Sequence, residues 1–179
     1  TGFNNVTVRI GSNTNYNESE YCIEPTTSAP FINGICNMSV TIYRARTSYP
    51  DGSGANIKVK FGNKEYDSEN FDVVPGSVTN LLVLVDGMTH KPGLKHVGIP
   101  GYKGYEGSPK VVEAGQGFSL KVYYLDDNYN RVYSYPTHYC KLTSSDDFAT
   151  LDGVSLYSSD VRVTITAGAY ETSTGMVLR

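Results

Sequence analysis

The chain has 179 residues, enough for one large domain or two small ones, and its formal net charge is −3. That charge gives no electrostatic reason to expect a nucleic acid as partner, and no apolar run approaches the roughly 20 residues that insertion into a membrane as a helix requires. Charged residues make up only 18% while 15 tyrosines are present, a composition typical of secreted β-proteins.

Apolar and polar residues alternate with period two in five segments, and helical periodicity is nearly absent. This pattern predicts strands with one face on a core and the other in water, as in antiparallel sheets. The segments are residues 6–10, 38–42, 57–61, 118–124 and 161–165. In the last two, the core is predicted to contain Phe118, Leu120, Val122, Val161, Val163 and Ile165.

Turn signals separate these segments, among them Gly62-Asn63, Asp126-Asp127-Asn128 and Asp152-Gly153. Short strands with regular turns predict a sandwich or a barrel. Pro75-Gly76 ends one apolar strand shortly before another begins, so the predicted modules are residues 1–76 and 77–179. The long stretch 86–109 is interpreted as an extended strand that crosses between sheets, the alternative being a functional loop.

Six segments follow one another in an order that resembles a known bacterial repeat. They are residues 71–76, 81–85, 92–109, 114–118, 126–132 and 143–151. Together they are similar to the tandem immunoglobulin-like, filamin-like modules of bacterial surface and cell-wall proteins. The resemblance covers roughly residues 70–168 and is weaker over 31–69, and Tyr129 stands where the family usually has Trp.

The resemblance implies an all-β fold of two immunoglobulin-like antiparallel β-sandwich modules in tandem, the first matching only the back half of a repeat. It also implies an extracellular structural protein, a subunit or repeat of a filament, sheath or stalk at the cell surface. The alternative is an adhesin or carbohydrate-binding module on such a stalk. The expected partners are therefore other copies of the chain, other surface proteins, or glycans. Fold analogy by itself does not choose among these roles.

The cysteines and sequons agree with an oxidising, extracellular compartment. Cys22 and Cys36 flank a short segment and are predicted to form a local disulfide, whereas Cys140 has no obvious mate. Three Asn-x-Ser/Thr sequons mark candidate glycosylation sites on an exposed surface. They begin at Asn5, Asn17 and Asn37.

One segment resembles the start of a metal-binding loop. Asp126, Asn128 and Asn130 place side-chain oxygens at alternate positions, and Ca²⁺ prefers several carboxylate and amide oxygens at once. The Gly and Glu that complete a calcium loop further along are missing. The alternative is a hairpin turn in which these side chains bond the local backbone. Calcium is the one cofactor that the sequence suggests, and the turn interpretation needs none.

Catalytic motifs are absent, since the chain has no Gly-x-Ser-x-Gly sequence, phosphate-binding loop or His-Glu-x-x-His sequence. We therefore expect a protein that is not an enzyme. Tyr102 and Tyr105, in a Gly-rich stretch, are candidates for stacking on sugar rings. The alternative for both is packing between strands, which Tyr does well.

The resemblance also implies that the second module stops short of the family's final strand, which would leave a sheet edge open. An unpaired edge is a template for a strand from another chain. The N-terminal segment offers such a strand through Phe3, Val6, Val8 and Ile10. The hypothesis is a head-to-tail homopolymer in which this strand completes the next subunit. The alternative is that the missing strands lie in adjacent repeats of a longer chain.

Overall fold

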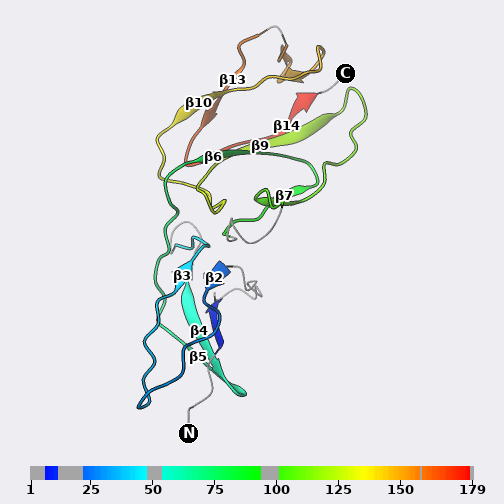
Figure 1. The fold of residues 1–179 in the computed structure, drawn as a ribbon. Helices are drawn as coiled ribbons and strands as arrows, with labels where there is room; N and C mark the ends of the chain where they lie inside the picture. Colours follow the sequence, from blue (N-terminus) through cyan, green and yellow to red (C-terminus); the bar gives the residue numbers. More distant parts are fainter. Residues whose placement is uncertain (1–6, 12–21, 48–53, 94–100, 158, 178–179) are drawn as a thin grey trace. The chain divides into compact units, whose positions relative to one another are not determined.

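The computed structural model describes residues 7–11, 22–47, 54–93, 101–157 and 159–177 (Figure 1). These residues form antiparallel strands and no α-helix, which confirms the predicted all-β class. Accordingly, no described helix has the length and apolar character needed to cross a membrane. The chain divides into two compact units: unit 1 comprises Thr1–Pro75 and Gly93–Gly101, and unit 2 comprises Gly76–Pro92 and Tyr102–Arg179.

Unit 1 contains two small antiparallel sheets. Three strands pair in the order β1-β4-β5, and a two-stranded sheet joins β2 to β3. The β4–β5 hairpin turns at the predicted Gly62-Asn63 position. The strands are β1 (Thr7–Gly11), β2 (Ile23–Glu24), β3 (Thr41–Ile42), β4 (Asn56–Phe61) and β5 (Lys64–Asp67).

The core of unit 1 is small. Ile23 is the buried member of its apolar cluster, whose other side chains remain partly exposed, and Cys22 and Ala55 are also buried among the described residues. Phe61, expected on the buried face of its strand, is instead 48% exposed, because no described side chain of the core cluster of unit 1 covers that end of β4. The partly buried members are Phe31, Met38, Val40, Ile42, Ile57 and Val59. The described residues of unit 1 thus bury too little apolar surface to make a complete sandwich.

Unit 2 is built in two layers (Figure 1). Its first layer is a five-stranded antiparallel sheet in the order β12-β11-β14-β9-β6, and its second layer is the β10–β13 pair. A β7–β8 hairpin accompanies them, so the stretch 86–109 is not the single extended strand that the sequence predicted. The strands are β6 (Asn80–Val85), β7 (Met88–His90), β8 (Tyr105–Gly107), β9 (Gly117–Leu125), β10 (His138–Lys141), β11 (Thr150–Leu151), β12 (Val154–Ser155), β13 (Arg162–Ile165) and β14 (Ala169–Val177).

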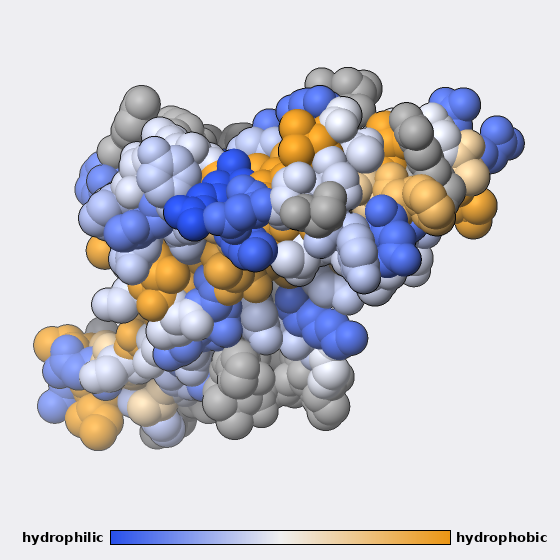
Figure 2. Space-filling view, turned by 90° about the horizontal axis from the view of Figure 1, so that it is seen from above, coloured by the Kyte–Doolittle hydropathy of each residue, from blue (hydrophilic) through white to orange (hydrophobic). Residues whose placement is uncertain are grey.

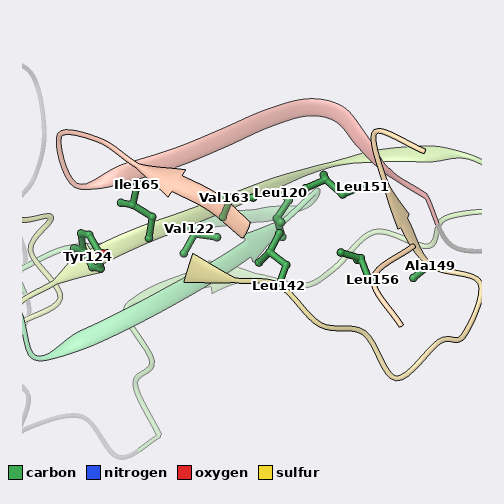
Figure 3. Close-up of a cluster of buried hydrophobic side chains, with 9 residues drawn as sticks. All are labelled: Leu120, Val122, Tyr124, Leu142, Ala149, Leu151, Leu156, Val163 and Ile165. Carbon is green, nitrogen blue, oxygen red and sulfur yellow. The ribbon is translucent and has the colours of Figure 1, made fainter. Parts of the chain in front are cut away.

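The core between the two layers contains most of the residues that alternation predicted. Val122 and Ile165 have no exposed surface, and Leu120 and Val163 are nearly as buried. Phe118 is buried as well, and Val161 packs against the cluster while partly exposed. Figure 3 shows nine members of this core: Leu120, Val122, Tyr124, Leu142, Ala149, Leu151, Leu156, Val163 and Ile165.

Strand β9 is the centre of unit 2 because both of its faces are covered. Its even-numbered residues from Leu120 to Tyr124 face the core between the layers. Tyr123 and Leu125 belong to a second cluster with Leu82 and Leu84, against which Met88 of the β7–β8 hairpin packs. A strand buried on both faces is expected inside a sheet, not at its edge, and β9 lies between β14 and β6.

Candidate functional site

The carboxylate of Asp126 holds together the turn that follows β9. Its side chain is 4% exposed and accepts five hydrogen bonds. Oδ1 accepts from the backbone nitrogens of Asn128 and Asn130, each at 2.9 Å. Oδ2 accepts from the backbone nitrogen of Gly76, also at 2.9 Å, and the Asn130 side-chain amide donates to both oxygens. The carboxylate therefore ties the turn to the start of unit 2.

This arrangement agrees with the turn interpretation of Asp126, Asn128 and Asn130. Both oxygens of Asp126 are already engaged by N–H donors, which a bound cation would have to displace. Asn128 and Asn130 contribute nitrogen atoms to these hydrogen bonds, whereas calcium would take their side-chain oxygens. Across the described residues, no three His, Cys, Asp or Glu side chains are grouped so as to hold a metal ion.

Tyr102 and Tyr105 are engaged within unit 2. The Tyr102 ring meets Tyr129 edge-to-face with centroids 5.3 Å apart, and its hydroxyl donates to the carbonyl of Lys91. Tyr105 packs against the cluster of Leu82 and Leu84 on the outer face of the sheet. A β-carbon at Gly104 would lie 2.4 Å from Cδ1 of Tyr129, so a glycine is needed here for the aromatic contact. Packing thus accounts for both tyrosines.

More strongly exposed aromatic rings lie elsewhere in unit 2. Tyr139 on β10 is 72% exposed, and Phe148 and Tyr157 are 67% and 65% exposed. Tyr139 points away from the core because its neighbour Cys140 packs on the core and alternate residues of a strand face opposite sides.

An electrostatic cluster covers the outer face of β9. The Tyr123 hydroxyl donates to Glu171 at 2.8 Å, and the Arg131 guanidinium lies over the Tyr123 and Tyr133 rings at 5.1 and 4.6 Å. Burial, together with the hydrogen bond to Glu171, raises the pKa of the Tyr123 hydroxyl to about 12. A phenol held protonated in this way is suited to structural hydrogen bonding, not to acid–base exchange near neutral pH.

Asp86, which follows β6, also has a structural role through its hydrogen bonds. Its carboxylate accepts hydrogen bonds from the hydroxyl and the backbone nitrogen of Ser119 on β9. These hydrogen bonds hold the pKa of the Asp86 carboxyl below its ordinary value. Asp86 therefore fastens the β6–β7 turn to the neighbouring strand.

All three cysteines are free thiols in the structure, so the disulfide expected between Cys22 and Cys36 is not formed in it. Cys22 is 2% exposed, inside unit 1 beside Ile23. The Cys36 thiol is partly exposed and donates to the carbonyl of Ala29 at 3.3 Å. Cys140 packs at the margin of the unit 2 core.

The structure describes one of the three predicted glycosylation sites, Asn37. Asn37 is exposed and lies outside any strand, as a glycosylated asparagine requires. Asn5 and Asn17 lie outside the described residues.

The proposed donor strand is paired inside its own unit. β1 lies antiparallel to β4, with Val8 opposite Val59 and Ile10 opposite Ile57. This pairing is what the strand-donation hypothesis excluded, so the hypothesis is wrong for Val8 and Ile10 in this structure. The physical reason is that β4 offers a matching alternating strand within the same unit. Phe3 and Val6 lie outside the described residues.

An uncovered apolar stripe lies on the edge strand β6. Leu81 is 54% exposed and Val83 is 50% exposed. They stand opposite Tyr124 and Val122 of β9, and residues directly opposite in an antiparallel pair share one sheet face. Tyr124 and Val122 belong to the core between the layers. The second layer therefore covers this face over β9 but leaves it open over Leu81 and Val83, whereas Val85 at the end of β6 packs against the core. Leu81 and Val83 are called the β6 stripe below.

The second layer also has an open edge. Among the described residues, β10 pairs with β13 alone, which leaves its other edge without a neighbouring strand. In Figure 3, β10 is the strand of the second layer drawn on the side of β6. The space-filling view of Figure 2 shows apolar side chains in patches among polar ones on the face it displays. An open edge beside an apolar stripe is a surface on which another chain could add.

Unit 1 has an apolar pocket of about 240 Å³. It lies against the small core, with Ser28 and Cys36 as the polar groups in its wall. The remaining lining residues are Phe31, Met38, Val40, Ile57 and Val59. The pocket reflects the incomplete packing of unit 1 and holds no cluster of titratable side chains.

Comparison with known proteins gives no match to any family model, curated protein or solved structure.

Proposed function

We propose that this chain is a structural β-module of an extracellular assembly, a building block of a cell-surface filament, sheath or stalk. Unit 2 is an immunoglobulin-like sandwich whose second layer, in the described residues, has two strands and an open edge at β10. The role needs no cofactor and no catalytic group. Its partners are other copies of the chain or other surface proteins.

The observation that supports this proposal is the open edge of the second layer of unit 2, beside the exposed β6 stripe. Five strands form one layer and two form the other, and the β6 stripe remains about half exposed beside the open edge of β10. Open strand edges promote association between chains unless the fold blocks them. The open edge of β10 carries no proline or bulge that would block pairing, and the charge of Lys141 in β10 is paired with Asp160.

The polar groups of unit 2 also support a structural role. Asp126, Tyr123 and Asp86 each hold strands or turns together through hydrogen bonds with partners distant in the sequence. Groups that serve chemistry are usually left free to meet a substrate in a cleft. The polar side-chain atoms of these three described residues instead make hydrogen bonds within the fold.

Sedimentation velocity and negative-stain microscopy of the purified chain test the proposal. A structural module should form concentration-dependent oligomers or fibres that survive moderate salt, because the association is driven by strand pairing and apolar contact. A monodisperse monomer at all concentrations, with no fibres, would contradict it.

A second candidate is an adhesin or carbohydrate-binding module, which the exposed rings of Tyr139, Phe148 and Tyr157 favour. Aromatic rings stack on the apolar faces of sugars as they do on other rings. Binding of a monomeric form to a glycan array, lost in Tyr139→Ala or Tyr157→Ala, would support this candidate. Absence of binding to any glycan would dismiss it.

A further inference from the structure

We infer that the open edge of β10 takes up a single extended polypeptide strand, whose apolar side chains cover the β6 stripe. The inference deepens the proposed assembly role and rests on it. The occupant is a lone strand with apolar residues at alternate positions.

The backbone of β10 supplies the hydrogen-bonding groups for such a strand. The nitrogen of Leu142, the residue after β10, donates to the carbonyl of Val161 at 3.0 Å, so even-numbered residues bond toward β13. In an antiparallel pair these positions alternate with positions whose N–H and C=O point away. The backbone groups of Tyr139 and Lys141 therefore face the open edge, and an added strand would pair with them.

The β6 stripe supplies the apolar contact. Leu81 and Val83 share a face with Tyr124 and Val122, which the second layer buries to 7% and 0% exposure. One more strand beside β10 extends the second layer by about 4.8 Å toward β6. Alternate side chains of that strand then point at Leu81 and Val83. The same strand thus satisfies the β10 edge and covers the stripe.

The geometry favours a lone strand over a second copy docked edge to edge through β10. Antiparallel pairing of two β10 strands about a two-fold axis would keep the first layers of both copies on the same side. Each β6 extends beyond its own second layer, as the exposure of Leu81 and Val83 shows. The two β6 strands would then compete for one space. A single extended segment has no layer beneath it and avoids this clash.

The test is peptide binding to the full chain, measured by fluorescence anisotropy. The probes are labelled eight-residue peptides with Val or Ile at alternate positions. We expect saturable binding by at least one peptide. N-methylation of alternate residues removes the N–H donors along one edge of the peptide. Methylation along the edge that pairs with β10 should weaken binding at least tenfold, and methylation along the other edge should change it less than threefold. Equal effects of methylation along both edges, or no binding by any peptide, would overturn the inference.

Paired variants locate the site. Tyr139→Pro removes an outward N–H from an edge, where proline is tolerated, and should weaken binding at least tenfold, whereas Tyr139→Ala should have little effect. Val83→Lys should weaken binding similarly, whereas Val111→Lys should not, because Val111 is 99% exposed in the segment between β8 and β9. Circular dichroism confirms that each variant is folded. Binding that survives both Tyr139→Pro and Val83→Lys would place the peptide elsewhere and overturn the inference.

The outcomes separate this inference from the proposed function. If no peptide binds while the chain still forms fibres, the assembly role stands and strand addition at β10 is wrong. If peptides bind at β10 while the purified chain remains a monomer, strand addition stands and self-assembly is wrong.

Discussion

Leu81 of β6 and Tyr124 of β9 stand opposite each other on one face of the same sheet, yet Leu81 is 54% exposed and Tyr124 only 7%. Over Leu81 and Val83, the second layer of unit 2 therefore ends between β9 and β6, whereas Val85 of β6 still packs against the core. A core that stops at this line leaves apolar surface in water that one further strand would cover. The central claim about function derives from this contrast.

The core boundary predicts unequal effects of two leucine truncations. Leu120→Ala, inside the core at 3% exposure, should lower the free energy of unfolding by about 2–5 kcal/mol. Leu81→Ala, on the same face of the sheet, should lower it by less than about 1.5 kcal/mol because half of its side chain is already in water. Urea unfolding followed by circular dichroism measures both. Similar losses would show that β6 is covered in solution.

Removal of the Asp126 carboxylate should destabilise unit 2. Asp126→Ala leaves the N–H groups of Gly76, Asn128 and Asn130 without their acceptor, at about 1–3 kcal/mol for each buried group left unpaired. Asp127→Ala, at the exposed neighbouring position, is the matched control. Thermal melting with and without Ca²⁺ completes the experiment. A melting temperature that Ca²⁺ raises in the wild type but not in Asp126→Ala would favour the calcium interpretation.

Alkaline pH should weaken the fold through Tyr123. Its pKa is raised to about 12 in the folded chain, above the value of about 10 for an unperturbed tyrosine. The stabilisation is therefore fully present below pH 10 and is lost as the pH rises toward 12. Melting temperatures measured from pH 9 to 12 should fall less steeply for Tyr123→Phe than for the wild type. Tyr157→Phe, with an exposed ring, should follow the wild type.

The thiol count distinguishes the structure from the disulfide that the sequence predicted. Under denaturing, non-reducing conditions the structure predicts three reactive thiols per chain. In the folded state Cys22 should be unreactive, because it is 2% exposed. A single reactive thiol in denaturant, identified as Cys140 by peptide mapping, would instead show that Cys22 and Cys36 form a disulfide.

Period-two alternation predicted some of the strands that form the core of unit 2. Strand β9 and its buried residues Leu120 and Val122 follow from it directly. Strand β14 does not, because Thr172 to Gly175 interrupt its alternation where its register shifts against β9. Strand β5 was also missed, since all four of its residues are exposed and carry no apolar pattern.

The candidate site was predictable only in part. Asp126 was recognised as a turn or metal residue, but its bond to Gly76 joins residues 50 positions apart and no local pattern reveals it. The exposure of Leu81 and Val83 could not be predicted from the sequence either. An apolar run such as residues 81–85 predicts a buried strand, and only the pairing order shows that β6 is at an edge with its face uncovered.

Sedimentation velocity of the wild-type chain beside Val83→Lys and Val111→Lys tests the central claim most directly. A lysine at Val83 places a charge on the β6 stripe, and charges at sheet edges oppose association. We predict concentration-dependent assembly of the wild type and of Val111→Lys, and a monomer for Val83→Lys with an unchanged circular dichroism spectrum. Assembly of Val83→Lys equal to that of the wild type would contradict the account.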